Sequence, residues 1–354
     1  MKVLIAGDGR SKIHEVSLHN GFVREGHQAE LFKWHGFLKR SRFSLSKRVQ
    51  EKLLLGPTID YLNKCLLTAV EEFKPDLLFV YRGTVIKPST LQKIKQKFPK
   101  IRVIGYNNDD PFAPQHSSFT WRLFKNSLKE YDLVYAYRPH NVQEYIDNGA
   151  QKSKLLMPWY CSDLHLPVQL TDEEVEKYST SVVFIGHYED DGRAELLLKL
   201  IKKGIDVKIF GPIGKKYSGW GGAVEKHPEL RRLLPINMLW GREYAAAISA
   251  AKISVCFFSK FNRDKYTRRC FEIPSIGGFL LSEYSEELEQ ILKPDQEAAY
   301  FRNEEEFLQK VMFYLEHEDK RKQVAKAGHL TITGQGHNEM ARATKVLSDV
   351  GMIT

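Results

Sequence analysis

The stretch Arg263–Leu281 reads RDKYTRRCFEIPSIGGFLL and connects two apolar runs, Ile253–Phe258 and Phe279–Leu281. Short apolar runs of this kind predict strands of a parallel sheet that is buried on both faces. The segment between them carries arginines, two carboxylates, a proline and a glycine pair. Loops that follow such strands are where α/β sheets bind ligands. The stretch therefore predicts a ligand site on an α/β sheet.

The residue types within this stretch suit a phosphorylated ligand. Guanidinium groups pair with phosphate, carboxylates accept hydrogen bonds from sugar hydroxyls, and glycines let the backbone approach closely. The residues that offer these groups are Asp264, Arg268, Arg269, Glu272, Gly277 and Gly278. A solvated helix start with surface ion pairs is the alternative interpretation of the charges alone.

A strand, a glycine turn and a helix open the chain. The apolar run Val3–Ala6 is followed by Gly7 and Gly9, and a helical pattern begins near Ser11. The turn is not a dinucleotide fingerprint, because Lys12 occupies the position of the third glycine. It is either a ligand loop at the end of a strand or the ordinary start of an α/β domain. His14, in the first turn of the helix, is a candidate base with a structural role as the alternative.

Two adjacent carboxylates, Asp109 and Asp110, follow the predicted strand Ile101–Tyr106 and precede Pro111. A carboxylate pair at the end of a strand is a candidate base or hydroxyl-binding pair. A turn rich in Asn and Asp explains the same residues structurally.

The second half of the chain restarts the pattern. A predicted strand over 181–185 ends at Gly186, and a predicted helix begins at Arg193. A further strand, Val207–Phe210, ends in a glycine turn that carries Lys215. Such a turn suits a pyrophosphate, although it lacks the Walker spacing.

Two successive halves of alternating strands and helices predict a two-domain α/β protein. The expected architecture has two Rossmann-like, doubly wound domains that face each other across a cleft, with a helical C-terminal end. The segment from Pro158 to about Thr171 lacks periodicity and is the candidate linker. The expected domains are 1–160 for the acceptor and 161–337 for the nucleotide, with a helix over 338–354 that packs back on the first domain.

Composition limits the partners. The formal net charge of +9 favours an anionic partner. The basic residues are spread along the chain without a known nucleic-acid module, so no nucleic-acid partner is expected. The four cysteines lack CxxC spacing, which predicts reduced thiols and no metal site. The chain opens directly into a strand and has no apolar run of about 18 residues, so a cytoplasmic protein is expected.

The stretch 38–48 combines basic residues with aromatic and aliphatic ones. It could bind an anionic or lipid-linked acceptor, or lie on the cytoplasmic face of a membrane. A solvated loop is the alternative interpretation.

Residues 268–284 resemble the signature of CgeB-type glycosyltransferases, a GT-B family named for a spore-maturation protein. That signature runs roughly R-x-F-E-I-P-A-C-G-G-F-L-L-x-E. Other segments fit the same resemblance: Asp109-Asp110-Pro111, Gly149-Ala150, and, near the end, His337 and Arg342. The resemblance therefore spans nearly the whole chain.

The resemblance implies roles for individual residues. Glu272 would bind the ribose hydroxyls of a donor nucleotide. Asp264 takes the first position of an E-x7-E motif, where the family type is Glu. Arg268 or Lys215, with Arg193, would neutralise the diphosphate, and the amides of Gly186, Gly277 and Gly278 would approach it. Such enzymes use no metal and no cofactor, since basic residues and a helix N-terminus stabilise the leaving group.

The implied activity is a hexosyltransferase of bacterial surface polysaccharide or spore and cell-envelope glycan synthesis. The donor would be a nucleoside-diphosphate sugar, a UDP-sugar by preference, and the acceptor a hydroxyl of a glycan, lipid-linked or protein molecule. An inverting reaction would need a base from among Asp109, Asp110 and His14, whereas a retaining reaction needs none. The alternative is a non-catalytic protein of the envelope that binds a nucleotide sugar or polysaccharide.

Overall fold

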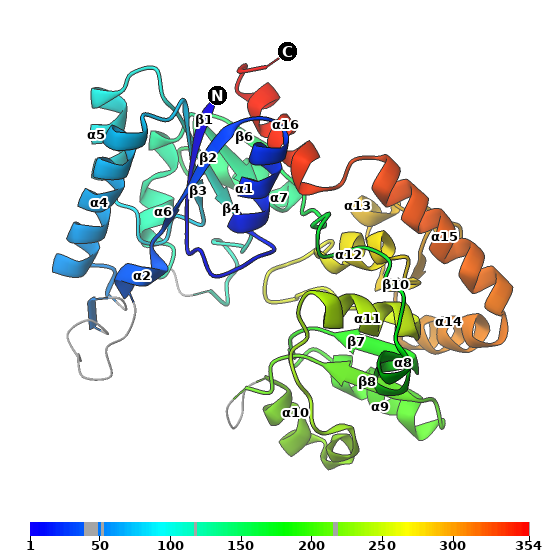
Figure 1. The fold of residues 1–354 in the computed structure, drawn as a ribbon. Helices are drawn as coiled ribbons and strands as arrows, with labels where there is room; N and C mark the ends of the chain where they lie inside the picture. The colour runs from blue at the N-terminus through cyan, green and yellow to red at the C-terminus, as the bar shows by residue number, and fades with distance from the viewer. Residues whose placement is uncertain (39–48, 51–52, 117–118, 215–218, 354) are drawn as a thin grey trace. The chain divides into compact units, whose positions relative to one another are not determined.

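The computed structural model describes residues 1–38, 49–50, 53–116, 119–214 and 219–353, so Lys215 and nearly all of the basic stretch 38–48 lie outside the described residues. The chain forms two compact units (Figure 1). The first unit comprises residues 1–157 and 339–354, and the second comprises residues 158–338. The chain therefore leaves the first unit once and returns to it near its C-terminal end.

The first unit is built on a six-stranded parallel sheet in the order β2-β1-β3-β4-β5-β6. Its strands are β1 (Lys2–Gly7), β2 (Gln28–Lys33), β3 (Leu77–Tyr81), β4 (Arg102–Asn107), β5 (Leu133–Ala136) and β6 (Ser153–Leu155). Every residue of β3 and β5 is buried, as expected for a parallel sheet covered on both faces. The strand order reverses between β1 and β3, which is the point where doubly wound sheets bind ligands.

Helices cover the faces of this sheet. They are α1 (Glu15–Arg24), α2 (His35–Leu38), α4 (Pro57–Phe73), α5 (Pro88–Lys97), α6 (Arg122–Asn126), the 3-10 turn η1 (Leu128–Glu130), α7 (Pro139–Asp147) and α16 (Glu339–Asp349). Three of them, α4, α5 and α7, begin with proline. Proline fits the first helical position because its missing N–H would have no partner there anyway.

Helix α16 packs against α1 in the first unit (Figure 1). Its residues Ala343, Val346 and Leu347 are fully buried. At the crossing, a Cβ on Gly21 would overlap the carbonyl oxygen of Glu339, so only glycine lets the two helices approach this closely. The buried Glu339 also forms an ion pair of 2.9 Å with Arg24. These contacts fix the last helix to the first one.

The second unit has a five-stranded parallel sheet in the order β11-β10-β9-β7-β8. Its strands are β7 (Thr180–Ile185), β8 (Val207–Phe210), β9 (Ala251–Cys256), β10 (Leu280–Glu283) and β11 (Ala299–Phe301). Its helices are α8 (Asp172–Tyr178), α9 (Arg193–Lys202), α10 (Gly219–Lys226), η2 (Pro228–Leu233), α11 (Arg242–Ala250), α12 (Arg269–Ile276), α13 (Glu286–Glu289), α14 (Glu304–Glu316) and α15 (Glu318–Gly334). The strand order reverses here between β7 and β9.

The predicted linker is a folded part of the second unit. Trp159, Cys161 and His165 are buried. The segment ends at a capping box in which Thr171 and Glu174 bond each other's backbone, starting α8. The segment predicted as a linker thus begins where the second unit begins and is partly buried in it. Irregular backbone can be buried when side chains and carbonyls satisfy its polar groups. Within the part of the chain that the structure describes, no helix has the length and apolar character to cross a membrane.

Candidate functional site

The stretch Arg263–Leu281 forms a loop after β9, the helix α12 and the strand β10. Glu272, in the first turn of α12, is buried, with only 4% of its surface exposed. One carboxylate oxygen, Oε1, accepts from Nε of Arg268 at 3.1 Å, and the other, Oε2, accepts from the hydroxyl of Tyr244 at 3.0 Å. A buried carboxylate with charged and hydroxyl donors is a preformed acceptor of hydrogen bonds.

His165 completes the surroundings of Glu272, with Nε2 3.7 Å from Oε1. The amide of Cys161 donates to Nδ1 of His165 at 3.0 Å, so the ring proton lies on Nε2 and faces Glu272. Burial raises the pKa of Glu272, but His165 and Arg268 outweigh it and hold the pKa below its ordinary value. The group is therefore an ionised carboxylate at neutral pH.

The two adjacent arginines of the stretch point to different places. Arg268 lies over the ring of Trp159, with its guanidinium carbon 5.1 Å from the ring centre. Arg269 lies over Phe184 of β7 at 5.9 Å and donates to the carbonyl of Phe257 at 3.4 Å. Arg268 thus belongs to the surroundings of Glu272, whereas Arg269 fixes the start of α12 to the ends of β7 and β9.

Gly186 makes room for Arg269. Its amide donates to the carbonyl of Phe210 at 2.8 Å, and its own carbonyl accepts from the indole of Trp220 at 2.9 Å. A Cβ at this position would lie 2.7 Å from Nη1 of Arg269. The amide of Gly186 is therefore bonded at the edge of the sheet, and the expectation that it approaches a diphosphate stays a prediction.

The pair Gly277-Gly278 ends α12. Gly277 has φ = 89° and caps the helix. Its amide donates a hydrogen bond to the carbonyl of Pro274 at 2.8 Å. The amide of Gly278 donates to the carbonyl of Ile273 at 3.0 Å. A left-handed glycine with these bonds is a common way to end a helix. These amides are bonded at the C-terminal end of α12, whereas Arg268 and Arg269 are at its start. The expectation that the amides approach a diphosphate stays a prediction.

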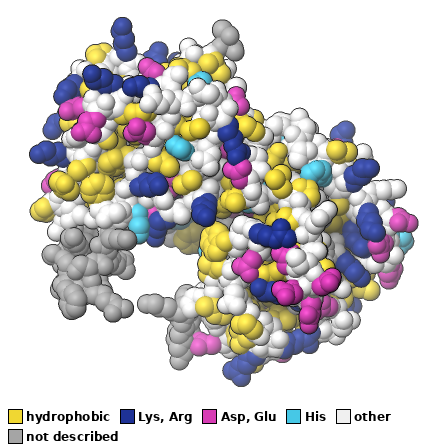
Figure 2. Space-filling model, in the orientation of Figure 1, with side chains coloured by type: hydrophobic (Ala, Val, Ile, Leu, Met, Phe, Trp, Pro, Cys, Tyr) yellow, Lys and Arg dark blue, Asp and Glu magenta, His cyan; other side chains and the backbone are white. Residues whose placement is uncertain are grey.

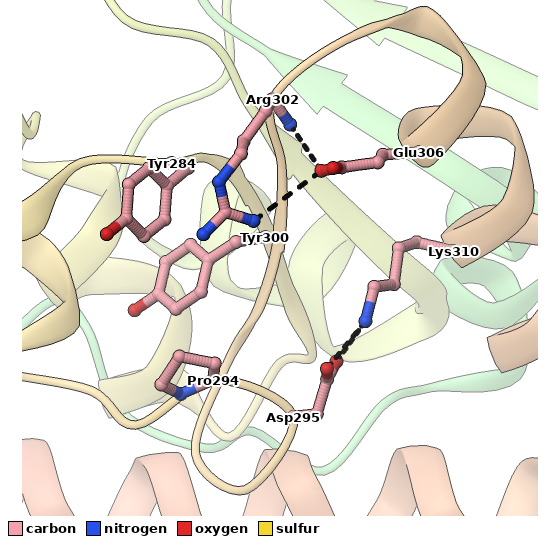
Figure 3. A pocket seen from close by; sticks show the side chains of 7 residues that line it. All are labelled: Tyr284, Pro294, Asp295, Tyr300, Arg302, Glu306 and Lys310. Atoms are coloured by element: carbon pink, nitrogen blue, oxygen red, sulfur yellow. Dashed lines mark hydrogen bonds and ion pairs between the residues drawn. The ribbon is translucent and has the colours of Figure 1, made fainter.

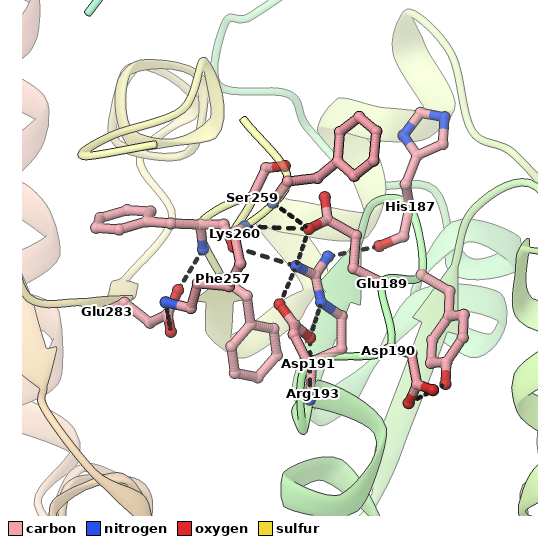
Figure 4. A network of polar contacts seen from close by, with 12 residues as sticks. His187, Glu189, Asp190, Asp191, Arg193, Phe257, Ser259, Lys260 and Glu283 are labelled. Atoms are coloured by element: carbon pink, nitrogen blue, oxygen red, sulfur yellow. Dashed lines mark hydrogen bonds and ion pairs between the residues drawn. The ribbon is translucent and has the colours of Figure 1, made fainter. Parts of the chain in front are cut away.

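Arg193 is buried in a polar network after β7 and β9 (Figure 4). Its Nε and Nη2 pair with both oxygens of Asp191 at 2.8 and 2.7 Å, a two-pronged ion pair. It also donates to the carbonyls of His187 at 2.8 Å and Phe258 at 3.1 Å. The guanidinium is 2% exposed, so this geometry supports a role in holding two loops together rather than a contact with a diphosphate.

The loop that carries Asp264 is anchored by acidic side chains (Figure 4). Glu189 accepts from the amide of Lys260 at 3.1 Å, and Glu283 accepts from Nζ of Lys260 at 2.7 Å and from the amide of Phe258. The amide of Asp264 donates to the carbonyl of Ser259 at 2.9 Å. These hydrogen bonds hold the backbone of the loop at Asp264, which belongs to the same stretch of sequence as Glu272.

In the first unit, the Gly7–Gly9 turn surrounds a buried glutamate. Glu15, 2% exposed, accepts from the amide of Gly9. A Cβ on Gly7 would lie 2.9 Å from Cγ of Glu15. Burial raises the pKa of Glu15. Sequence analysis missed this residue, because a glutamate in the first turn of a helix ordinarily interacts with the helix N-terminus in solvent. His14 precedes it, with its ring 5.7 Å from that of Tyr81.

The structure separates the adjacent carboxylates Asp109 and Asp110. Asp109 pairs with Arg82 and is 23% exposed. Asp110 is fully buried and accepts from the amide of Phe112 at 3.0 Å and from the side chain of Asn141 at 3.0 Å. It also lies 3.1 Å from Nε2 of His140. The two acids therefore have different surroundings, and His140 is a neighbour of Asp110 that the sequence analysis did not single out.

A cavity of about 280 Å³ lies beside β10 and β11 (Figure 3). Its charged side chains already have partners, since Lys310 pairs with Asp295 at 2.6 Å and Arg302 with Glu306 at 3.7 Å. The guanidinium of Arg302 also lies 3.8 Å from the ring centre of Tyr284. The cavity contains none of the site residues predicted from sequence. On the visible face, Lys and Arg side chains are interspersed with acidic and apolar ones in both units (Figure 2).

Solved structures of known proteins are similar to this chain over nearly its whole length. Sucrose-phosphate synthase from Thermosynechococcus elongatus matches with a TM-score of 0.72 at 11% identity, over 99% of this chain and 98% of that one. HepE of Anabaena, solved in complex with UDP-glucose, matches at 0.68 and 12% identity over the whole of both chains. A glycosyltransferase from Rickettsia africae matches at 0.67 and 13%, over 98% and 97%. The chain has the GT-B fold.

The GT-B fold confirms the fold class predicted from the sequence. In addition, residues 193–348 match a family model described as glycosyl transferase-like. The matched segment contains α12 with Arg268 and Glu272. No curated protein sequence matches the chain.

Proposed function

We propose that this protein is a glycosyltransferase that moves a sugar from a UDP-sugar to an acceptor hydroxyl. The observation that carries the proposal is the buried, ionised Glu272 on the first turn of α12, bonded by Arg268 and Tyr244. This turn lies within the segment that matches the glycosyl transferase-like model. In the proposal, the second unit binds the donor and the first unit binds the acceptor.

The chemistry of the site suits a nucleoside diphosphate. Glu272 offers two carboxylate oxygens to ribose hydroxyls, and Arg268, next to it, offers guanidinium donors to a phosphate. Asp264, on the anchored loop, is proposed to contact the transferred sugar. We propose uracil as the nucleobase of the donor, because HepE, which shares the fold, binds UDP and UDP-glucose. We further propose that the leaving diphosphate is stabilised by Arg268, and by Lys215, without a metal ion.

The resemblance of residues 268–284 to the CgeB-type signature supports a finer assignment, in which the acceptor is a glycan, lipid-linked or protein hydroxyl of the bacterial cell envelope. Peripheral contact with a membrane through the stretch 38–48 is part of this assignment. Both belong to the proposal.

Nucleotide-dependent stabilisation tests the donor site. A ligand that binds only the folded protein raises its Tm by mass action. We expect UDP to raise the Tm equally with EDTA and with magnesium, and we expect smaller effects from GDP, dTDP, CMP and NAD. The variant Glu272→Gln should lose the UDP effect, whereas Glu173→Gln, an exposed carboxylate on α8, should keep it.

The outcomes decide between functions. Release of UDP from UDP-glucose by the wild type, lost in Glu272→Gln, supports the transferase. UDP binding without any release would leave a nucleotide-sugar-binding protein. If UDP raises the Tm of the wild type and of Glu272→Gln by the same amount, Glu272 does not contribute to UDP binding.

A further inference from the structure

The pair Asp110–His140 forms a buried carboxylate–imidazole dyad at the carboxyl edge of the first sheet. Asp110 follows β4, and His140 is the second residue of α7, which follows β5. The two side chains meet with Nε2 of His140 3.1 Å from Oδ2 of Asp110. Carboxyl ends of parallel strands are where α/β proteins bind ligands. The dyad therefore lies at the edge where an acceptor is expected.

The surroundings of Asp110 fix its state and that of the imidazole. Oδ1 of Asp110 accepts from the Phe112 amide and from Asn141, both at 3.0 Å. A group that accepts so many hydrogen bonds is a carboxylate, which has no proton to donate. The proton in the Asp110–His140 bond must therefore be on Nε2 of His140. The lone pair of the neutral imidazole is then on Nδ1.

Nδ1 of His140 is open to a substrate. The His140 side chain is 28% exposed, whereas Asp110 is fully buried. Among the described residues, Nδ1 has no hydrogen-bond partner. An imidazole with one nitrogen on a buried carboxylate and the other exposed is the arrangement that makes histidine a general base.

We propose that His140 is the base that deprotonates the acceptor hydroxyl, and that Asp110 is its positioning residue. The inference rests on the proposed function. The competing candidates are less suited, because Asp109 is already paired with Arg82. Both oxygens of Asp110 are already bonded, one by Phe112 and Asn141 and the other by His140. The sequence-based choice of these two acids is thus refined to a neighbour that only the fold brings to Asp110.

The acceptor hydroxyl gives its proton to Nδ1 of His140 while its oxygen attacks the anomeric carbon of the donor sugar. The bond between that carbon and the diphosphate oxygen breaks, and UDP leaves with the electron pair. The imidazolium is stabilised by Asp110 and returns its proton to water. Displacement from the opposite face inverts the anomeric configuration.

Other charged groups face this region and enter its pH dependence. Glu144 lies one turn along α7 from His140, and its Oε2 accepts from Asn141 at 2.6 Å. Lys125 on α6 interacts with Asp110 and Glu144, and burial lowers its pKa. Arg138 precedes α7 and donates to the carbonyl of Asn108 at 3.2 Å. Glu144, Lys125 and Arg138 are all still present when His140 is replaced. A pH dependence of the rate that is absent from a His140 variant is therefore assigned to His140.

UDP-glucose with water as the acceptor tests the proposal on the full chain. We expect His140→Gln to slow UDP release by about 100-fold or more, with the Tm increase by UDP unchanged. The rate of the wild type should depend on pH in a way that the His140→Gln variant lacks. Proton NMR should show the β anomer of glucose first. His27→Gln, just before β2 at the opposite edge of the sheet, should behave as wild type.

A second variant separates positioning from folding. Asp110→Asn keeps the shape of the side chain but can hold the imidazole in the other tautomer, so it should lose activity while still responding to UDP. Unchanged UDP release in His140→Gln, or release of the α anomer by the wild type, would show that His140 is not the base. A wild type that binds UDP but releases none from UDP-glucose would contradict the transferase function itself. If UDP does not raise the Tm of the wild type, the proposed function itself is wrong.

Discussion

The guanidinium of Arg269 lies directly against the backbone of Gly186. A Cβ on residue 186 would be 2.7 Å from Nη1 of Arg269 and 2.9 Å from Cζ of Phe184. This contact joins the end of β7 to the start of α12, the helix that carries Glu272. The absence of a side chain at position 186 is therefore a packing requirement of the candidate donor site.

The variant Gly186→Ala should be destabilised. The added methyl group must displace Arg269 and Phe184, and such overpacking costs about 1–3 kcal/mol. Urea denaturation should show this loss in the free energy of unfolding. Gly334→Ala, at the end of α15 with open space around its Cβ position, should change the free energy by less than about 0.5 kcal/mol. Equal stability of the two variants would contradict the contact.

The crossing of α1 and α16 gives a second packing prediction. Gly21→Ala would press its methyl group against the carbonyl of Glu339, a backbone atom that cannot rotate away. The expected loss is about 2 kcal/mol or more, with faster hydrogen exchange in α1 and α16. Val23→Ala on the same helix, where the side chain is 47% exposed, should leave exchange in both helices unchanged.

Glu272 predicts a pH-dependent difference in stability without any ligand. Its pKa is lowered in the folded state from the ordinary 4.5, so its ionised form stabilises the fold above that pH. The contribution is lost as the pH falls through the folded-state pKa. Glu272→Gln cannot titrate and leaves Arg268 without its charge partner, at a cost of about 3 kcal/mol near neutral pH.

The stability gap between wild type and Glu272→Gln should therefore narrow as the pH falls below about 4.5. Chemical denaturation at a series of pH values measures this gap. A gap that stays constant down to pH 3 would contradict a lowered pKa of Glu272 in the folded protein. Glu173→Gln supplies the control, since an exposed carboxylate should show little gap at any pH.

The four thiols should differ in their reaction with iodoacetamide. Cys65 is partly exposed, whereas Cys161, Cys256 and Cys270 are buried. Burial raises the pKa of Cys256, but contacts with Cys270 and Arg269 outweigh it and lower the pKa to about 6. Ionisation alone would make Cys256 react first. Because access also limits the reaction, mass spectrometry should find label on Cys65 in the native protein and on all four thiols in denaturant.

Much of the fold was predictable from short apolar runs. The apolar runs Val3–Ala6 and Ile253–Phe258 overlap β1 and β9, since strands that are covered on both faces are mostly apolar. The alternation of strands and helices predicted parallel sheets and hence a ligand site at their carboxyl edges. Glu272 and Arg268 were predicted as charged residues of the connection between two such runs, and their role in donor binding stays a prediction.

The remaining site residues were not predictable, because their roles depend on contacts between distant segments. His165 lies in a segment without periodicity and reaches Glu272 only after folding. His140 is separated from Asp110 by a helix and a strand. Gly277 and Gly278 looked like a ligand loop, but the same residues end a helix equally well. Local sequence does not distinguish these cases.

The return of α16 to the first unit affects how the chain folds during synthesis. A domain that is continuous in sequence can fold as soon as it leaves the ribosome. The first unit cannot complete its packing until residues 339–349 have emerged, which happens only after all of the second unit. We therefore expect a nascent chain stopped at residue 338 to protect the second unit from protease while α1, still without α16, is cleaved.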